Sequence, residues 1–355
     1  MSLGKKKMLS QGAAGGVVAT DNFNTVLYTG NGGTQAVTGV GFQPDFVWFK
    51  VRNTANEHVL FDSVRGVGER IHTNTTDSQA STLPNGLTTF GSDGFTVVDN
   101  SGGGTGVNGN FNYVSWNWYA PTSESISASG SRIASTVKKN VDAGFSIVQG
   151  SFATNEASTK VVGHGLTSPK LIIYKATNIV LPWFIFGEHG GSVFGNNNVL
   201  RFNTDAAAND SSFDITGTTF KVGSTGTAHT FIAYCFENVA GYQKIGSYAG
   251  NGTTQTIDVG FTPRFVMIKA FTNSSTHTSW AMFDNQRLVS YDDTNPLYAN
   301  LSAAEGARGN GSGDGDLLEI IFVANTGFKL GDASRNNGSD ELNDGSNNYL
   351  YLAIA

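Results

Sequence analysis

Three segments of the 355-residue chain decide the fold, because they repeat one pattern: GFQPDFVWFK at residues 41–50, GLTSPKLIIYK at 165–175 and GFTPRFVMIK at 260–269. Each segment starts with glycine and an apolar residue, passes a proline, and ends in a short apolar run closed by lysine. Proline fixes φ and cannot donate to a sheet, so we expect it to mark the start of a strand each time. The repetition predicts several copies of one β-rich unit.

The segments around this pattern recur in the same order. Tyr-x-Gly-Asn-Gly-x-Thr-Gln precedes the first and third copies, starting at Tyr28 and Tyr248. An aromatic-rich strand running into a polar turn follows each copy, and an alternating apolar strand closes it at 112–120, 229–237 and 348–355. We therefore predict three tandem modules, at residues 25–120, 144–238 and 239–355.

Composition favours strands over helices in these modules. The chain has 45 Gly, only 7 Pro, and 39% hydrophobic residues, with many polar turn residues between short apolar runs. Alternation with a period of two suits half-buried antiparallel strands. The predicted fold is all-β, with three antiparallel β-sandwich modules of a jelly-roll-like type. The Gly-Asn-Gly triplets at Gly30 and Gly250 are expected to form tight hairpin turns with positive φ.

Two segments outside the modules differ from them in composition. Residues 1–24 are rich in Gly and Ala and predict an extended N-terminal arm that orders on a partner. Residues 121–143 are small and polar with no clear period, which predicts a linker and a first module that sits apart from the other two.

Charge and cysteine content exclude several classes of protein. The net charge of −6 without a basic face argues against nucleic-acid binding. No run reaches the roughly 18–20 apolar residues of a membrane span. The single Cys235 cannot form an intrachain disulfide, and its apolar surroundings in the sequence predict a buried side chain.

Signals for catalysis are weak, and we predict a protein that is not an enzyme, with no catalytic residues and no cofactor. No two of the six histidines have a metal-ligand spacing, and half of them fall at strand edges or turns typical of surface histidines. Asp62 and Asp284 occupy equivalent turns, with Glu188 close to that place in the second copy. Asx caps explain the repeated Asp most simply, while paired carboxylates for glycoside cleavage remain the alternative.

Two sets of residues are candidates for binding. The acidic stretch GNGSGDGD at 309–316 offers a weak calcium site made of Asp314, Asp316 and Glu319, against the simpler interpretation as a surface loop. Trp116 and Trp118 share strand parity and are expected in the core, which would turn Tyr113 and Tyr119 outward. These two tyrosines and the polar tip around Asn196, Asn197 and Asn198 are the candidates for glycan contact.

These repeated phrases resemble those of a family of repeat-containing structural proteins of tailed bacteriophages, common in marine phage genomes. Its typical phrases are a Tyr-Thr-Gly-Asn-Gly turn, Gly-Phe-x-Pro-x-Phe-Val-x-x-Lys, an Asp-x-x-Arg-Gly turn, an Asp-Gly-Phe strand and a closing Asn-x-Tyr-Val-x-Trp strand. The second module departs from the pattern, with Gly187 in place of the turn Asp. In the first module the phrases stand at 28–32, 41–50, 61–66, 93–95 and 112–118.

The resemblance implies a virion structural protein on the particle exterior, in a capsid decoration, head fibre, tail fibre or tail tip, made in the host cytoplasm. It implies attachment to other virion proteins, for which the N-terminal arm is the candidate, and a contribution to surface attachment. Apolar faces at module edges favour a homo-oligomer, for instance a trimer. A carbohydrate-binding adhesin for host-surface glycans is one alternative function, and a capsule polysaccharide depolymerase is the other.

Overall fold

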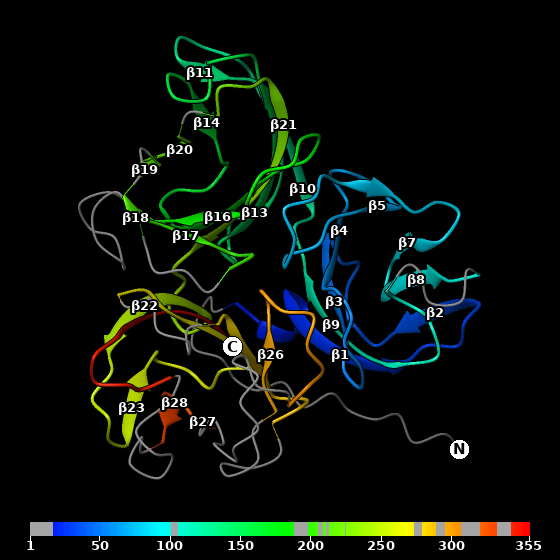
Figure 1. Ribbon diagram of the computed structural model, residues 1–355, viewed down its shortest axis with the longest axis vertical. Coiled ribbons are helices and arrows are strands. Elements are labelled where there is room, and N and C mark those ends of the chain that lie inside the picture. Colours follow the sequence, from blue (N-terminus) through cyan, green and yellow to red (C-terminus); the bar gives the residue numbers. More distant parts are fainter. Residues whose placement is uncertain are drawn as a thin grey trace, which may run out of the picture.

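The structure of the protein is a computed structural model. It describes residues 17–100, 106–187, 198–204, 209–210, 213–223, 225–272, 279–288, 295–306, 320–331 and 342–355. These residues form antiparallel strands, one short parallel pair and a single 3-10 turn, with no α-helix among them. The predicted all-β, antiparallel sandwich class is confirmed. The strands group into three lobes around a common centre (Figure 1).

Lobe 1 is a sandwich of one four-stranded and one three-stranded sheet, with a short two-stranded ribbon beside them. Its elements are η1 (Ala19–Asp21), β1 (Phe23–Thr29), β2 (Thr34–Thr38), β3 (Phe46–Val51), β4 (Val59–Asp62), β5 (Glu69–Arg70), β6 (Ala80–Ser81), β7 (Gly86–Gly91), β8 (Gly94–Val98) and β9 (Asn112–Trp118).

Lobe 2 contains the largest sheet, with eight strands, and a second sheet of four. Its strands are β10 (Thr122–Ile126), β11 (Arg132–Ile133), β12 (Ser135–Asn140), β13 (Phe145–Phe152), β14 (Val161–Gly163), β15 (Pro169–Ala176), β16 (Phe184–Phe186), β17 (Asn198–Arg201), β18 (Asn209–Asp210), β19 (Asp214–Thr216), β20 (Thr219–Lys221) and β21 (His229–Glu237).

Lobe 3 pairs a five-stranded sheet with a three-stranded one. Its strands are β22 (Gln243–Ala249), β23 (Gln255–Asp258), β24 (Phe265–Ala270), β25 (Ala281–Asp284), β26 (Leu297–Tyr298), β27 (Ile320–Val323), β28 (Gly327–Leu330) and β29 (Asn348–Ile354).

The three lobes share one strand order. The large sheets contain β1-β9-β3-β4, β13-β21-β15-β16 and β22-β29-β24-β25, and the small sheets contain β2-β8-β7, β14-β20-β19 and β23-β28-β27. In the large sheet of every lobe, the strand of this set that comes first along the chain therefore pairs with the one that comes last: β1 with β9, β13 with β21, and β22 with β29. Such pairing joins residues distant in sequence, so no lobe is complete until its closing strand is in place.

The predicted linker is wrong. Residues 121–143 contain β10 and β12, which pair with each other and extend the large sheet of lobe 2 through β13. The short strand β11 adds in parallel to β14 of the small sheet. The small polar residues at the start of this segment form the exposed edge strand β10, which is exposed along nearly its whole length and so needs no apolar period.

The central strands of the large sheets are buried on both faces, which is why they lack a polar face. In β3, Phe46 and Trp48 point to a core shared by all three lobes, while Val47 and Phe49 point to the core inside lobe 1. β15 and β24 divide their side chains in the same way. The half-buried strands expected from the sequence are thus fully buried at these positions.

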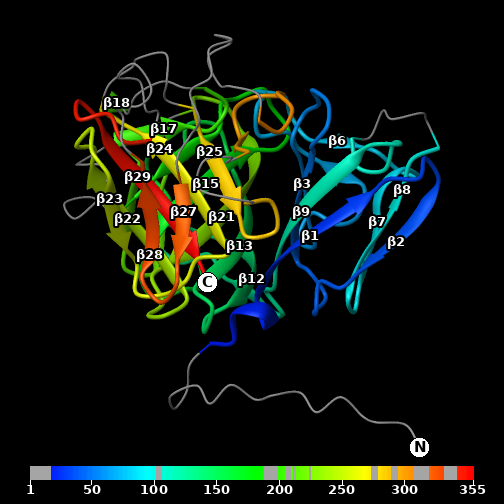
Figure 2. The same ribbon diagram turned by 90° about the horizontal axis from the view of Figure 1, so that it is seen from below.

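Aromatic rings join the lobes across the shared core. Phe46 of lobe 1 stacks on Tyr234 of lobe 2, with ring centroids 4.2 Å apart. Phe202 of lobe 2 meets Trp280 of lobe 3 edge-on at 5.0 Å, and Trp118 of lobe 1 lies 6.1 Å from Phe265. The first lobe therefore does not sit apart, contrary to the expectation from its supposed linker. Figures 1 and 2 show the lobes packed side by side around this centre.

The predicted arm of residues 1–24 is wrong for its last part. Phe23 starts β1 with no exposed surface, and Val17 and Ala19 pack against the shared core. The C-terminal Ala355 packs against the same core and bonds Tyr242, so both ends of the described chain lie at one pole of the molecule (Figure 2). Residues 1–16 lie outside the described part of the chain.

The repeated turns have mixed outcomes. Pro44 and Pro263 precede β3 and β24, and Pro169 is the first residue of β15, as predicted. The Gly-Asn-Gly turns are not hairpins, because β1 and β2 belong to different sheets of the sandwich. Gly32 has the positive φ of 69°, whereas Gly30 is needed for space: a Cβ there would lie 2.0 Å from the carbonyl oxygen of Gly109.

Candidate functional site

The residues predicted for glycan contact are only partly brought to the surface. Tyr113 is fully buried and stacks on Tyr28 with ring centroids 4.9 Å apart, so the prediction that it faces outward is wrong. It projects from β9 to the side opposite Trp116, but the second sheet of lobe 1 covers that side. Tyr119 follows β9 and stays partly exposed. Asn196 and Asn197 lie outside the described residues, and Asn198 begins β17.

The calcium candidates Asp314, Asp316 and Glu319 also lie outside the described residues. Within the described ranges, no three His, Cys, Asp or Glu side chains come close enough to hold a metal ion.

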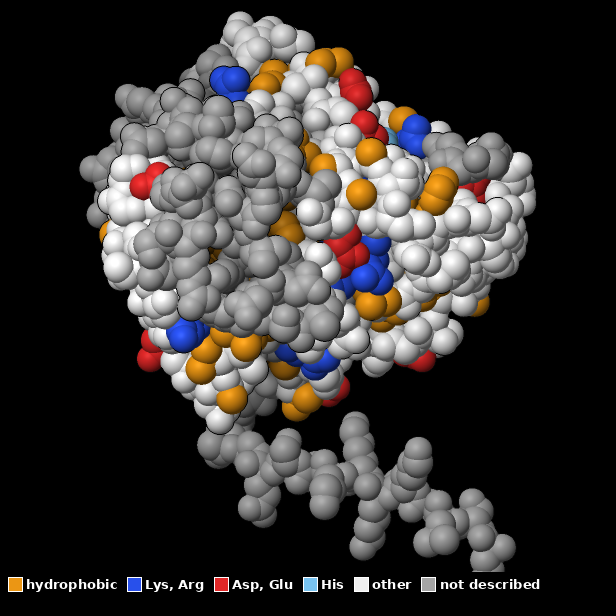
Figure 3. All heavy atoms as spheres, turned by 60° about the horizontal axis from the view of Figure 1, so that its bottom comes forward, with side chains coloured by type: hydrophobic (Ala, Val, Ile, Leu, Met, Phe, Trp, Pro, Cys, Tyr) orange, Lys and Arg blue, Asp and Glu red, His pale blue; other side chains and the backbone are white. Residues whose placement is uncertain are grey.

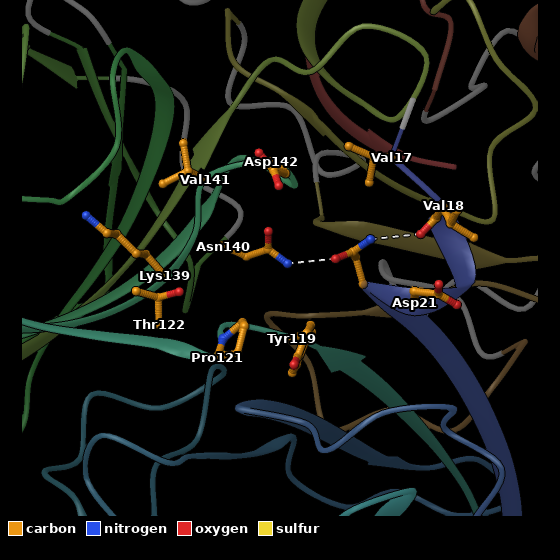
Figure 4. Close-up of a pocket in the computed structure, with 11 residues that line it drawn as sticks. Val17, Val18, Asp21, Tyr119, Pro121, Thr122, Lys139, Asn140, Val141 and Asp142 are labelled. Atoms are coloured by element: carbon orange, nitrogen blue, oxygen red, sulfur yellow. Dashed lines mark hydrogen bonds between the residues drawn. The ribbon is translucent and has the colours of Figure 1, made fainter. Parts of the chain in front are cut away.

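Tyr119 borders a hollow of about 450 Å³ at the pole where the described chain begins. This polar hollow is formed by three segments: the N-terminal turn with Asp21 and Asn22, the crossover from lobe 1 to lobe 2, and the β12–β13 turn. Figure 4 shows Asp142 on one side of the Asn22–Asn140 bond and Tyr119 and Pro121 on the other. Its lining is Val17, Val18, Asp21, Asn22, Tyr119, Pro121, Thr122, Lys139, Asn140, Val141 and Asp142.

Two asparagines hold the floor of the polar hollow. The Asn140 side chain donates to Asn22 Oδ1 at 2.7 Å and accepts from the backbone N–H of Ala143 at 3.1 Å. Asn22 in turn donates to the Val18 carbonyl at 2.8 Å. Asn140 is only 8% exposed, so this bond joins the N-terminal segment to lobe 2 in a largely dry place. Side chains of Asn suit such turns because they bond neighbouring backbone.

The walls of the polar hollow carry free polar groups. Asp21 and Asp142 are exposed, and neither carboxylate has a hydrogen-bond or ion-pair partner among the residues that the structure describes. Lys139 is partly exposed and bonds Glu124 on its outer side. The Tyr119 ring packs at 5.5 Å from Phe42, which fixes its plane at the rim. Sequence reasoning missed Asp21, Lys139, Asn140 and Asp142 because it assigned them to an arm and a linker.

The repeated turn carboxylates are structural. Asp62 Oδ1 accepts from the backbone of Val64 and Arg65, as an Asx cap does, and Asp284 does the same for Gln286 and Arg287. The second oxygen of each takes part in an ion pair of 2.6 Å, with Arg65 or Arg287. The predicted cap role is confirmed, and the carboxylates have no exposed surface for glycoside cleavage. Glu188 lies outside the described residues.

Each of these carboxylates also accepts from the neighbouring lobe. Tyr234 of lobe 2 donates to Asp62 at 2.9 Å, and Trp116 of lobe 1 donates to Asp284 at 3.0 Å. The strand registers place Leu352 of lobe 3 at the position equivalent to Trp116 and Tyr234. The place that Asp62 and Asp284 occupy in their lobes is held by Gly187 in lobe 2. The acceptor and its donor are therefore both replaced at the third junction.

A buried lysine ends the central face of each repeated strand. Lys50, Lys175 and Lys269 have no exposed surface. Lys50 donates to the carbonyl of Ser302 in lobe 3 at 3.2 Å, and Lys175 donates to that of Thr76 in lobe 1 at 3.2 Å. Burial lowers the pKa of Lys50 and of Lys175 to about 8. The amines of Lys50 and Lys175 thus bind backbone across a lobe junction, at an electrostatic cost from desolvation.

Three of the histidines are buried. His58 and His164 have no exposed surface and His229 only 2%, so these three are not surface histidines, whereas His72 is partly exposed. Burial lowers the pKa of all three, that of His164 to about 4. His58 accepts from Trp48 at 2.9 Å, and His229 lies 2.6 Å from the Tyr174 hydroxyl. His189 and His277 lie outside the described residues. Cys235 is buried as predicted, and burial raises the pKa of its thiol to about 12.

One comparison with known proteins assigns the chain to a family. Residues 18–355 match the family model described as "Domain of unknown function (DUF7483)". The chain belongs to this family. The match starts at the second described residue and includes all three lobes together, as well as the segment first assigned to a linker. Neither the curated proteins nor the solved structures contain a match to the chain.

The described part of the chain contains no helix of the length and apolarity that a membrane crossing requires. On the described part of the face shown in Figure 3, Lys and Arg side chains are few and scattered, and those at the centre lie beside Asp and Glu side chains.

Proposed function

We propose that the chain is a structural protein of a tailed-bacteriophage particle, displayed on the exterior as a capsid decoration, head fibre or tail-fibre component. The sequence resemblance suggests this class, and one structural observation supports it most: three sandwich lobes enclose a single aromatic core. In a body built in this way, the three lobes keep a fixed geometry relative to one another, because one core holds all of them. Rigid, glycine-rich β modules suit display at a particle surface, where weak contacts combine through effective concentration.

A role without catalysis is part of this proposal. The buried carboxylates Asp62 and Asp284 are occupied by arginine and by donors from the next lobe. The buried lysines and histidines bind backbone or aromatic side chains. Ionisable groups that are buried and held in place by bonds within their own fold are poor general acids and bases, because they cannot reach a substrate without disturbing the junctions of the lobes.

Attachment is proposed through the residues that precede Val17, which would bind other virion proteins. The support is positional: Val17 lies against the shared core at one pole, so a segment leaving there is anchored to all three lobes rather than to one. A homo-oligomer, for instance a trimer, remains a further proposal.

The test has two steps. Electron microscopy of intact particles with this chain located should place it on the exterior, and absence from purified particles would contradict the proposal. A variant lacking residues 1–16 should fold with an unchanged melting temperature but be lost from particles. Normal occupancy of the truncated protein would exclude attachment through that segment.

A carbohydrate-binding adhesin is the second candidate, favoured by the position of Tyr119 at the polar hollow. Binding to host polysaccharide without product release would support the adhesin. Formation of new reducing ends would instead indicate a depolymerase.

A further inference from the structure

The polar hollow has the size of a small-molecule site. Its volume of about 450 Å³ falls within the range of about 300–1,000 Å³ typical of such sites. It is bounded by three segments that are far apart in sequence, so its shape depends on the folded body and not on one loop. The hydrogen bond between Asn22 and Asn140 fixes two of these segments to each other.

Its polar groups match hydroxyls better than charges. Asp21 and Asp142 offer free carboxylate oxygens, Thr122 a hydroxyl and Asn140 an amide, all on the lining. A carboxylate has two acceptor oxygens that can take O–H donors in pairs, and the vicinal hydroxyls of a sugar supply such pairs. Tyr119 and Pro121 lie on the other side of the Asn22–Asn140 bond and provide apolar faces for C–H groups (Figure 4).

The charge of the lining selects against anions. Lys139 is the one cation among the lining residues, and it is already paired with Glu124. Two unpaired carboxylates therefore dominate the local potential, and a sialylated or uronic-acid sugar would be repelled. We propose that the polar hollow is a binding site for a neutral saccharide of one or two units, with Asp21 and Asp142 accepting from its hydroxyls and Tyr119 contacting its apolar face.

The experiment titrates the full-length chain with four neutral disaccharides, maltose, cellobiose, lactose and N,N′-diacetylchitobiose, by calorimetry and amide NMR. Sialyllactose and a trilysine peptide are the two comparison probes. Saturable binding of at least one neutral sugar, with shifts at the backbone amides of Asn22 and Asn140, is the expected result. Asp142→Asn and Tyr119→Ala should each weaken it about tenfold or more, since each removes one principal contact.

Asp77→Asn is the matched control, because Asp77 is an exposed acid in lobe 1 that does not line the hollow. It should leave affinity unchanged within about twofold. Three outcomes overturn the proposal: no saturable binding of any neutral sugar at tens of millimolar, unchanged affinity in both hollow variants while they remain folded by NMR, or stronger binding of sialyllactose or trilysine than of every neutral sugar.

Discussion

Two kinds of junction hold the lobes together. At the junctions of lobe 1 with lobes 2 and 3, a buried Asp–Arg pair accepts a hydrogen bond from the neighbouring lobe, through Tyr234 or Trp116. At the junction of lobes 2 and 3, Gly187 and Leu352 occupy the equivalent places. Because the carboxylate and its donor are both missing at this junction, we infer that the two act as one unit. A buried donor without the carboxylate would be left unsatisfied, so loss of the carboxylate favours loss of the donor.

Breaking the ionic junction should have the largest effect. Arg287→Met leaves Asp284 buried without its counter-ion, and we expect a loss of about 3–5 kcal/mol in the free energy of unfolding. Denaturant titration should still show one transition, because the shared core couples the lobes. The double variant Asp284→Asn with Arg287→Met should lose less than Arg287→Met alone. Equal losses would show that the charge pair is not what the junction depends on.

Removing only the donor should have a smaller effect. Tyr234→Phe keeps the ring packed on Phe46 but deletes the hydroxyl that bonds Asp62, so we expect a loss of about 1–3 kcal/mol by thermal or chemical unfolding. Leu352→Met is the matched change at the apolar junction and should cost below about 1.5 kcal/mol. A Tyr234→Phe variant as stable as the wild type would contradict the proposed coupling of acceptor and donor.

Lys50 and Lys175 should make the free energy of unfolding depend on pH in the alkaline range. Their folded pKa is lowered from 10.5 to about 8, so between these values the unfolded chain binds more protons and stability rises with pH. The slope is at most about 1.4 kcal/mol per pH unit for each lysine. Above pH 10 the raised pKa of Tyr351, about 12, opposes the rise.

The measurement for the lysines is the free energy of unfolding at intervals from pH 8 to 10. The double variant Lys50→Met with Lys175→Met should show a flatter profile across that window. A profile as steep as that of the wild type would assign the dependence to other groups.

The ion pair of Arg52 with Glu305 should be the weakest junction contact. Its Nε and Oε2 atoms lie 2.5 Å apart, and the two side chains are 27% and 11% exposed. We expect Arg52→Ala to cost below about 1 kcal/mol and the loss to shrink in high salt, because exposed pairs are screened. A loss as large as that of Arg287→Met would mean that partial exposure does not weaken this junction.

The sequence was sufficient for the fold within each lobe and insufficient for what joins the lobes. Repeated phrases that lead from Gly to Pro, together with aromatic alternation, located β3, β9, β15 and β24 within a residue or two. The runs FVWFK, LIIYK and FVMIK are apolar at nearly every position, a pattern typical of strands buried on both faces. That pattern is consistent with the core shared by the lobes, which the sequence analysis did not predict. The lysine that ends each run argued against burial on both faces, because a lysine rarely lies in a core.

The polar hollow could not be predicted from residue patterns. Asp21, Tyr119 and Asp142 belong to three segments that share no period and meet only because β12 joins the sheet of lobe 2. A segment of small polar residues has the same composition whether it forms a free linker or an edge strand, so tertiary pairing alone decided it. Tyr113 was misplaced for a related reason: parity gives the face of a strand but not whether a second sheet covers that face.

The single sulfhydryl of the chain can report on opening of the interior of lobe 2 through its reaction with reagents in solution. Cys235 lies on β21 without exposed surface, and its raised pKa keeps it in the unreactive protonated form. An alkylating reagent can therefore modify the folded chain only when β21 opens, so the rate of modification reports how often this strand opens. A cysteine engineered elsewhere on the surface would accept a fluorophore without competition, so the protein comes ready for site-specific labelling.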